Sequence, residues 1–274
     1  MITGCSSGIG RAAAMYFATE GWNVVATMRD PSAASELGDL PSVLIARLDV
    51  QDNGSIQAAV EAGIARFGSL DAVVNNAGYG QFGLFEAISD SQAKAQFDVN
   101  VFGVMNVLRA VLPHFRRQRS GVVTNVSSGA GLFTLPMISL YCASKFALEG
   151  FTEALSYELL SQNIRTKLVI PHGGVTETAF SERQAAAAAR GAAFEDYGDF
   201  VSEVEQAFAK MTAARTISAE EVAGVIFDAT TDGTERLRYL IGDDARGFVR
   251  ARRTLSDDDY VAFMRSHFAK QERS

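Results

Sequence analysis

Short apolar runs alternate with longer amphipathic stretches along most of this chain, and this alternation restricts the fold more than any other feature. The strand-like runs lie at 24–27, 43–46, 72–74, 121–126, 167–170 and 237–241. Between them, apolar residues recur every three and four positions at about 11–20, 54–67, 100–118, 141–162 and 218–230, as in helices. This repetition predicts a parallel sheet with helices on both faces. Right-handed crossovers make it an α/β, Rossmann-type doubly wound sheet of about seven strands.

Length and composition are those of one globular domain. The chain has 274 residues, of which 47% are hydrophobic and 21% are charged. No linker divides it and no internal repeat is visible, so we expect a single domain over 1–274. With 25 Lys and Arg against 32 Asp and Glu, the net charge of -7 disfavours nucleic acid as a partner.

Cysteine content and hydropathy bear on the location. Cys5 and Cys142 are too few for a disulfide scaffold and lack the spacing of a zinc site, so we expect no metal and a reducing cytoplasm. No stretch approaches the roughly 18 apolar residues of a membrane span. A glycine-rich loop begins at Thr3-Gly4, which leaves no room for a signal peptide. Only Met1 and Ile2 precede this loop, which leaves open whether the first strand is clipped.

The region at about 178–215 interrupts the alternation of strands and helices. It includes an alanine-rich segment at 184–193, which favours helix but offers little surface to anchor one. We predict a helical lid over a substrate site here, and the alternative is an ordinary surface helix. A C-terminal extension follows at about 243–274.

The glycine-rich loop between the first strand and the first helix predicts a nucleotide site. Glycines allow a tight turn and a close approach of the backbone to a pyrophosphate, whose charge is met by amides at the helix N-terminus. By itself such a loop can be a plain strand-to-helix turn. The predicted cofactor contacts in this loop are Gly4, Ser6, Ser7, Gly8, Ile9 and Gly10.

Polar residues at the ends of the next strands extend this site. Arg29 follows the second strand, where a guanidinium can pair with a 2′-phosphate, so we expect NADP to be preferred, with NAD possible. Its neighbour Asp30 precedes a proline and is interpreted as a turn or helix-capping residue. The third and fourth strands end in Asp49-Val50 and 75–78, at the edge where open α/β sheets bind ligands.

Tyr141 and Lys145 are four residues apart in a helical stretch, so both side chains project from one face. An ammonium near a phenol favours the phenolate and brings its pKa nearer to neutral acid–base work. Ser128, at the end of the fifth strand, could hold a carbonyl oxygen by a hydrogen bond. Ser127 is the rival candidate, since neighbouring side chains on a strand face opposite ways.

The accumulated pattern strongly resembles the short-chain dehydrogenase/reductase family over nearly the whole chain. The matching residues are Thr3-Gly4, Gly8, Gly10, Asp49-Val50, Asn75-Asn76-Ala77-Gly78, Asn100, Ser128, Tyr141 and Lys145. The segment 141–150, together with the loop at 4–8, looks most similar to the branch that contains 17β-hydroxysteroid and retinol dehydrogenases.

The resemblance implies a role for each matching residue. Tyr141 would be the acid in carbonyl reduction and the base in alcohol oxidation, and Lys145 would lower its pKa and bind the nicotinamide ribose. Ser128 would polarise the substrate oxygen, and Asn100 would hold a water that links Lys145 to solvent. Further cofactor contacts implied in this way are Arg29, Asp49, Val50, Asn76, Ala77, Gly78, Tyr141, Lys145, Gly173, Val175 and Thr178.

One segment departs from the family pattern. After the sixth strand, His172 occupies the position of the usual proline, which puts in doubt which threonine meets the cofactor. Thr178 is favoured, and His172 is interpreted as a loop residue. Loops around the reactive end carry apolar side chains that suit a bulky apolar substrate, although core or lid packing explains each of them equally well. The predicted substrate contacts are Phe82, Phe133, Leu135 and Phe180, with Phe85 and Met137 nearby.

The sequence therefore predicts an NADP(H)-preferring oxidoreductase that interconverts an apolar ketone or aldehyde and its alcohol. The alternatives are a noncatalytic dinucleotide-sensing regulator and an NAD(P)-dependent epimerase or dehydratase. Extra apolar positions in two helices favour a homodimer or homotetramer, although a buried helix of a monomer predicts much of the same pattern. These positions are Val104, Val107, Leu108, Val111, Phe151, Leu155 and Leu159.

Overall fold

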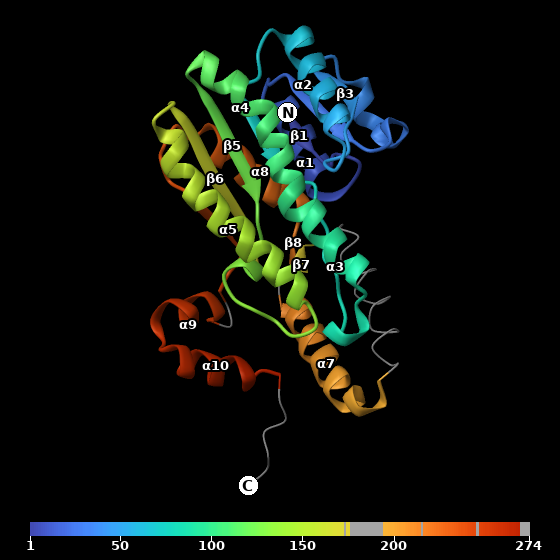
Figure 1. Ribbon diagram of the computed structural model, residues 1–274, viewed down its shortest axis with the longest axis vertical. Helices are drawn as coiled ribbons and strands as arrows, with labels where there is room; N and C mark the ends of the chain where they lie inside the picture. Colours follow the sequence, from blue (N-terminus) through green and yellow to red (C-terminus); the bar gives the residue numbers. More distant parts are fainter. Residues whose placement is uncertain (173, 176–193, 215, 245–246, 269–274) are drawn as a thin grey trace.

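A seven-stranded parallel sheet forms the centre of the protein, as seen in a computed structural model (Figure 1). The structure describes residues 1–172, 174–175, 194–214, 216–244 and 247–268. The strands of the main sheet are β1 (Ile2–Thr3), β2 (Val24–Met28), β3 (Val43–Arg47), β4 (Ala72–Asn75), β5 (Gly121–Val126), β6 (Ile164–Pro171) and β9 (Arg238–Ile241). A second, two-stranded sheet pairs β7 (Gly174–Val175) with β8 (Thr216–Ile217).

The strand order β3-β2-β1-β4-β5-β6-β9 confirms the predicted Rossmann-type doubly wound sheet. Neighbouring strands are parallel throughout, with Ile2 opposite both Ala26 of β2 and Val74 of β4. The order reverses between β1 and β4, because the chain first builds outward through β2 and β3 and then outward on the other side. In such sheets the crevice at this reversal, beyond the carboxyl ends of the strands, is where ligands bind.

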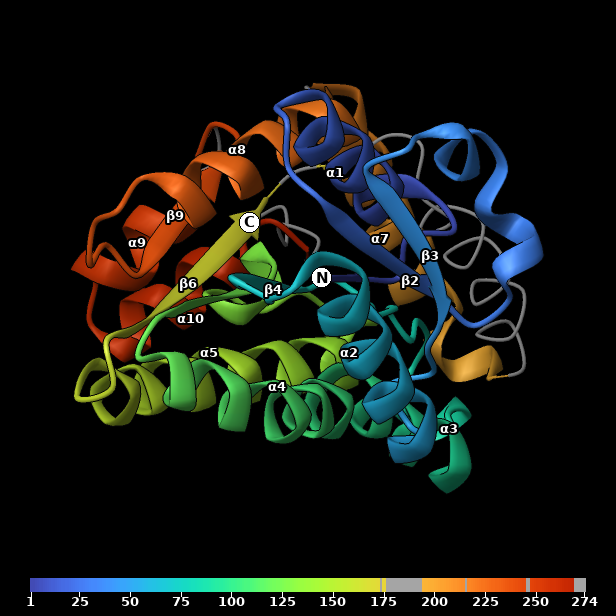
Figure 2. The ribbon, with the colours of Figure 1, turned by 90° about the horizontal axis from the view of Figure 1, so that it is seen from above.

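Helices cover both faces of the sheet, as predicted (Figure 2). The α-helices of the described residues are α1 (Gly8–Thr19), α2 (Asn53–Phe67), α3 (Asp90–Phe97), α4 (Val104–Gln118), α5 (Ser139–Leu160), α7 (Gly198–Ala214), α8 (Ala219–Thr231), α9 (Phe248–Thr254) and α10 (Asp257–Arg265). On one face α1 and α8 pack on a core that includes Phe17 and Ile226, and on the other face α2, α4 and α5 pack on a core that includes Val107 and Leu148.

Local signals explain where these elements begin and end. All five residues of β2 are buried, as expected for a central parallel strand covered on both faces. Asp52 caps α2 by accepting hydrogen bonds from the amides of Gly54 and Ser55, and Gly68, with φ +87°, ends this helix.

The stretch predicted as one helix at 100–118 begins earlier and is interrupted. Ser89 opens α3 with a capping box, and a π-helical turn, η3 (Asp98–Gly103), joins α3 to α4. The apolar pattern misses α3 because Gln96 is its only residue in the core, so little amphipathic periodicity is present. The π-helical turn carries Asn100, and such turns are frequent at functional sites.

The helices described within the predicted lid and C-terminal extension, α7, α9 and α10, lie beyond the carboxyl end of the sheet (Figure 1). Of the predicted lid, 178–193 and residue 215 lie outside the described residues, and the rest forms η5 (Glu195–Tyr197) and α7. The extension forms α9 and α10, whose Phe248 and Tyr260 pack in one cluster with Phe133. The lid itself stays a prediction.

The two helices expected to pair with a second subunit use their apolar positions within the chain. Val104, Val107, Leu108, Val111, Leu155 and Leu159 are all buried in the core of this one chain, and Phe151 packs against that core. Their pattern is therefore explained by the monomer, and it no longer supports an oligomer.

Candidate active site

The loop between β1 and α1 has the shape of a backbone cradle. Gly4 and Gly8 have φ values of +74° and +55°, which residues other than glycine rarely adopt. A Cβ on Gly10 would lie 2.3 Å from the carbonyl oxygen of Gly4. Ser7, the N-cap of α1, makes no side-chain capping bond, and both Ser6 and Ser7 are exposed. The first amides of α1 can therefore meet an anion.

Substitution of Gly10 by alanine is expected to damage this cradle. The new methyl group would overlap the Gly4 carbonyl, so the free energy of unfolding should fall by about 1–3 kcal/mol, as for other overpacked sites. NADPH binding, followed by its fluorescence, should weaken as well. The control is Gly150→Ala within α5, where the new Cβ has no atom within 4 Å apart from its chain neighbours and the backbone of its own helix, so stability should be unchanged or higher. Equal behaviour of the two variants would contradict the crowding argument.

Residues that follow β4 hold this loop in place through hydrogen bonds to Thr3. Asn76 donates from Nδ2 to the carbonyl oxygen of Thr3 at 3.0 Å, and the amides of Asn76 and Ala77 both donate to Thr3 Oγ1 at 3.0 Å. A Cβ on Gly78 would lie 3.2 Å from Asn100 Oδ1. Asn76 and Ala77 thus hold the cradle in shape, which their predicted role as cofactor contacts did not foresee.

The ends of β2 and β3 present the remaining predicted cofactor residues. Arg29 is exposed, whereas Asp30 accepts hydrogen bonds from the amide and hydroxyl of Ser32 at 3.0 and 2.8 Å and caps the short helix η1 (Pro31–Asp39). These bonds hold the pKa of Asp30 below its ordinary value. The interpretation of Asp30 as a capping residue is therefore correct. Asp49 Oδ1 accepts from the amide of Gln51 at 3.0 Å, and Val50 is buried against Gly103.

Tyr141 and Lys145 lie one turn apart on α5 and are both buried. The ammonium of Lys145 donates to the carbonyl oxygen of Val126 at 2.9 Å and lies 5.7 Å from the centre of the Tyr141 ring. The end of β5 therefore holds Lys145 beside the phenol, as the spacing of the two residues in the sequence predicts.

The ionisation of this pair differs from the sequence-based argument. Burial raises the pKa of Tyr141 to about 12, against the opposing effect of a hydrogen bond with Ser128. Burial lowers the pKa of Lys145 to about 8, and the charge of Glu149 opposes this shift. Loss of hydration is the larger effect at both groups, since each is taken out of water. At neutral pH the phenol keeps its proton, which is the form that an acid catalyst requires.

The structure decides between the two serines that follow β5. Ser128 shares a side-chain hydrogen bond with Tyr141, and its Oγ accepts from the amide of Ala130 at 3.2 Å, at the start of the short helix η4 (Gly129–Gly131). Ser127 is buried, and its hydroxyl has no partner among the described residues. Ser128 is thus the serine at Tyr141.

Asn100 reaches the same region from the π-helical turn. Its Nδ2 donates to the carbonyl oxygen of Tyr79 at 2.9 Å and to Ser144 Oγ at 3.2 Å, and its Oδ1 accepts from the amide of Tyr79 at 3.1 Å. Asn100 therefore ties the segment after β4 to α5, next to Lys145. The water that the resemblance assigns to Asn100 stays a prediction.

The segment after β6 is described only in part. Gly173, Thr178 and Phe180 lie outside the described residues, and Val175 is described only by its backbone, in β7. His172 is buried, and its Cβ lies 2.6 Å from where a Cβ on Gly129 would be. Burial lowers the pKa of His172, while Asp244 and Asp243 oppose the shift. Nothing local in the sequence indicates this burial, because Gly129 is 43 positions away.

The apolar residues predicted to meet the substrate divide between two clusters. Phe82 packs in one cluster with Tyr141, Ile138 and Cys142, and Leu135 joins this cluster to the second. In the second, Phe133 contacts Phe248 of α9 edge to face, with ring centres 5.2 Å apart. Phe85, in the short helix η2 (Phe85–Ala87), is largely exposed. Sequence patterns missed Phe248 because the extension is linked to Phe133 only by the fold.

Comparison with known proteins places the chain in a family. The family model for short chain dehydrogenases matches residues 1–188. An uncharacterized oxidoreductase of Schizosaccharomyces pombe is 35% identical over 236 residues, which cover 86% of this chain and 97% of the relative. The human 17-beta-hydroxysteroid dehydrogenase type 1 is 38% identical over 194 residues, 67% of this chain and 58% of that enzyme.

A solved structure agrees with this comparison. The short chain dehydrogenase/reductase of Burkholderia phymatum in complex with NAD superposes with a TM-score of 0.76 at 25% identity, covering 94% of this chain and 92% of that one. The chain therefore belongs to the short-chain dehydrogenase/reductase family. It is an oxidoreductase that acts on CH–OH groups with a nicotinamide cofactor.

The residues present fit such a cofactor. The loop turns so tightly that a Cβ on Gly10 would collide with Gly4 and Asn76, and the uncapped start of α1 offers amides to a pyrophosphate. Within the described residues, no helix combines the length and the apolar character that a membrane span requires.

Proposed function

We propose that this enzyme reduces an apolar ketone or aldehyde, and oxidises the corresponding alcohol, with NADP(H) as the preferred cofactor and Tyr141 as the acid–base catalyst. One observation carries the proposal: a buried phenol, hydrogen-bonded to Ser128, lies beside the ammonium of Lys145 at the carboxyl end of the sheet. Neither an epimerase nor a noncatalytic regulator is favoured by any contact at this site.

The cofactor, when bound, supplies the hydride, and the chain supplies position and protons. Tyr141 and Ser128 would both point hydroxyls at the substrate oxygen, so that Ser128 holds this oxygen while Tyr141 donates its proton during reduction. Lys145 keeps positive charge next to the phenol and stabilises the phenolate that remains. Asn100 holds the segment around Tyr79 against α5 and so keeps this face of the site in place.

Apolar surroundings support an apolar substrate. Phe82 and Ile138 pack with Tyr141, and Leu135 connects this group to Phe133. Side chains of this kind favour a ring or chain without charge. The name of the human relative, a 17-beta-hydroxysteroid dehydrogenase, points the same way.

The test is a panel of carbonyl compounds with NADPH, followed by loss of absorbance at 340 nm. We expect turnover of bulky apolar ketones or aldehydes and stoichiometric consumption of the cofactor. Turnover restricted to small charged keto acids, the oxidised forms of hydroxy acids, would overturn the substrate class. A reaction without net consumption of cofactor would point to an epimerase instead.

Arg29 is proposed as the source of the NADP preference. It is exposed at the end of β2, and its neighbour Asp30 is engaged by Ser32, which leaves the guanidinium to meet a 2′-phosphate. Replacing Arg29 by alanine should weaken NADPH binding about tenfold, the factor for one lost charge-assisted hydrogen bond, and leave NADH unchanged. Arg117→Ala, an exposed arginine at the end of α4, is the control. Tighter binding of NADH than NADPH by the unaltered enzyme would refute the preference.

A homodimer or homotetramer also remains part of the proposal, now on different residues. The large apolar side chains that α5 exposes are Phe146, Tyr157 and Leu160, and η3 exposes Phe102. Sedimentation of the enzyme as a monomer would contradict this oligomeric state.

The two cysteines are free and buried, which supports a reducing compartment such as the cytoplasm.

A further inference from the structure

A third polar residue continues the row of Tyr141 and Lys145 along α5. Glu149 follows Lys145 by four positions, so it lies one turn further on the same face of the helix. Only 5% of Glu149 is exposed. A buried carboxylate is costly unless it is paired, so its presence behind the reactive pair calls for a reason.

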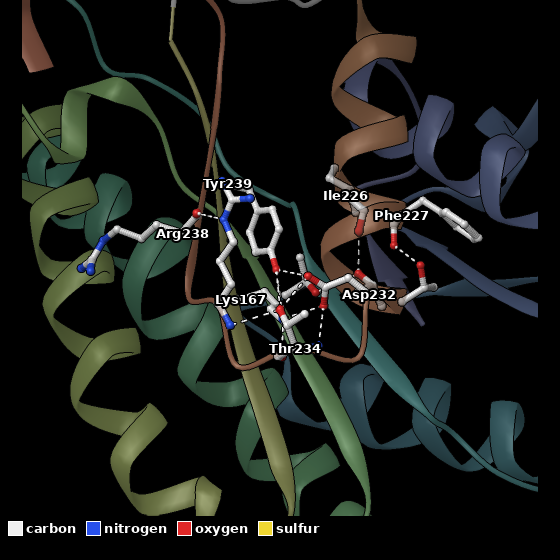
Figure 3. A network of polar contacts seen from close by, with 11 residues as sticks. Lys167, Ile226, Phe227, Asp232, Thr234, Arg238 and Tyr239 are labelled. Atoms are coloured by element: carbon white, nitrogen blue, oxygen red, sulfur yellow. Dashed lines mark hydrogen bonds and ion pairs between the residues drawn. The ribbon is translucent and has the colours of Figure 1, made fainter.

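The partner of Glu149 comes from the far edge of the sheet. Arg238, the first residue of β9, donates from Nε to Glu149 Oε2 at 2.9 Å, and its Nη2 pairs with Glu153. Figure 3 shows the Arg238 side chain pointing away from Lys167, Asp232 and Tyr239. Arg238 therefore clamps two carboxylates of α5, of which Glu149 is buried and Glu153 is 42% exposed at its side chain.

The second carboxylate oxygen of Glu149 does not take part in the pairing with Arg238. Glu149 Oε1 is buried and has no hydrogen-bond partner among the described residues. Gly131 gives the side chain its room, since a Cβ there would lie 3.0 Å from Glu149 Cγ and 3.1 Å from the Lys145 carbonyl oxygen. The carboxylate is thus held in a tight, dry position in which its charge is poorly screened.

We propose that Glu149 is a positioning residue for the acid–base pair: clamped by Arg238, its buried charge keeps the Lys145 ammonium charged beside Tyr141. This inference rests on the proposed function of Tyr141 and Lys145. Burial lowers the pKa of Lys145, the charge of Glu149 opposes this shift, and the two effects together leave the pKa at about 8. Lys145 would otherwise lose its proton within the working range of pH.

Among the residues that the structure describes, few other charges act on Lys145. On α5 the ionisable neighbours are Tyr141, Cys142 and Glu149, and β5 offers the carbonyl oxygen of Val126. The segment after β6 contributes His172, which lies against Gly129, and β9 contributes Arg238 through Glu149. Glu149 is the group whose charge the structure couples to Lys145.

The experiment compares pH profiles of kcat/KM for carbonyl reduction by the full-length enzyme and its variants. Glu149→Gln removes a negative charge, which lowers the pKa of a nearby ammonium and of a nearby phenol alike. We therefore expect the alkaline limb of the profile to shift to lower pH by about one unit. Glu153→Gln, the matched control on the same arginine, should leave the limb in place.

Folding and the underlying function are checked separately. Glu149→Asp keeps the charge, so its limb should stay within a few tenths of a unit of the unaltered enzyme even if activity falls. Coincident profiles for Glu149→Gln and the unaltered enzyme, or equal shifts in Glu149→Gln and Glu153→Gln, would overturn the role of Glu149. Full turnover by Tyr141→Phe would instead refute the proposed function, whatever Glu149 does.

Discussion

Tyr141→Phe should lower kcat by about 10²–10⁴-fold, the range that a positioned proton donor contributes. The change removes one hydroxyl from a buried ring that packs with Phe82 and Ile138, so the apolar contacts of the ring remain. Binding of NADPH should be nearly unchanged, because the cradle at Gly4 and Gly10 is built by other residues. The measurement is kcat under saturating substrate, together with a fluorescence titration of NADPH.

Tyr157→Phe is the matched control for this experiment. Tyr157 lies on the same helix, is 71% exposed and hydrogen-bonds Glu153, far along α5 from the reactive pair. Its loss should leave kcat as it was. If Tyr141→Phe and Tyr157→Phe had the same kcat as the unaltered enzyme, the assignment of the acid–base catalyst would be wrong.

Lys167→Met should lower the free energy of unfolding by about 3–5 kcal/mol, as when one partner of a buried ion pair is removed. The side chain of Lys167 is 1% exposed, in the middle of β6. Its ammonium donates to Asp232 Oδ1 at 2.9 Å, to the Thr234 carbonyl oxygen at 2.7 Å and to the Tyr239 hydroxyl at 3.1 Å (Figure 3). Methionine fills similar space but leaves these oxygens without their donor.

The same network predicts a dependence on pH. Burial raises the pKa of Asp232, but hydrogen bonds from Tyr239, Lys167 and Thr234 outweigh it and hold the pKa below its ordinary value. A carboxyl with a depressed folded-state pKa adds stability above its unfolded value, near 3.9, and loses it as the pH falls towards the folded value. In Lys167→Met this acid-sensitive part should shrink.

Chemical unfolding followed by the fluorescence of Trp22, the only tryptophan, provides the measurement. Trp22 packs against the core on the α1 and α8 side and reports its loss. Lys94→Met, on the exposed surface of α3, is the control and should stay within about 0.5 kcal/mol of the unaltered protein. A similarly small effect of Lys167→Met would show that the network contributes little to stability.

Much of the architecture was predictable because, in parallel α/β folds, buried strands and amphipathic helices each have a recognisable hydrophobic pattern in the local sequence. The run at 121–126 was predicted as a strand with the bounds that β5 has, and the helix expected at 54–67 differs from α2 by one residue. Buried parallel strands are continuous apolar runs, so no long-range information is needed to find them. The helix α3 escaped because its residues bury little and leave no periodic pattern.

The candidate site was predictable to a different degree. Tyr141 and Lys145 share one helix, so their approach follows from helical spacing alone. The choice of Ser128 over Ser127 needed the direction of each side chain at the end of β5. Strand alternation predicts that the two serines face opposite sides, but it does not say which of them faces Tyr141. The raised pKa of Tyr141 also departed from the expectation, because the extent of burial is a property of the packed chain.

The order of strands and helices, the glycine cradle and the row of reactive residues on α5 were determined by the sequence itself. The order of elements and the spacing on α5 depend on residues close in the chain, whose geometry the backbone period imposes, whereas the shape of the cradle also needs Asn76 and Ala77. The clamp of Arg238 on Glu149, 89 positions apart, the network around Lys167, and the packing of Phe248 on Phe133 were decided by the tertiary structure. Such charges and rings meet only once the sheet is assembled, because burial, and with it the strength of each charge, exists only in the folded chain.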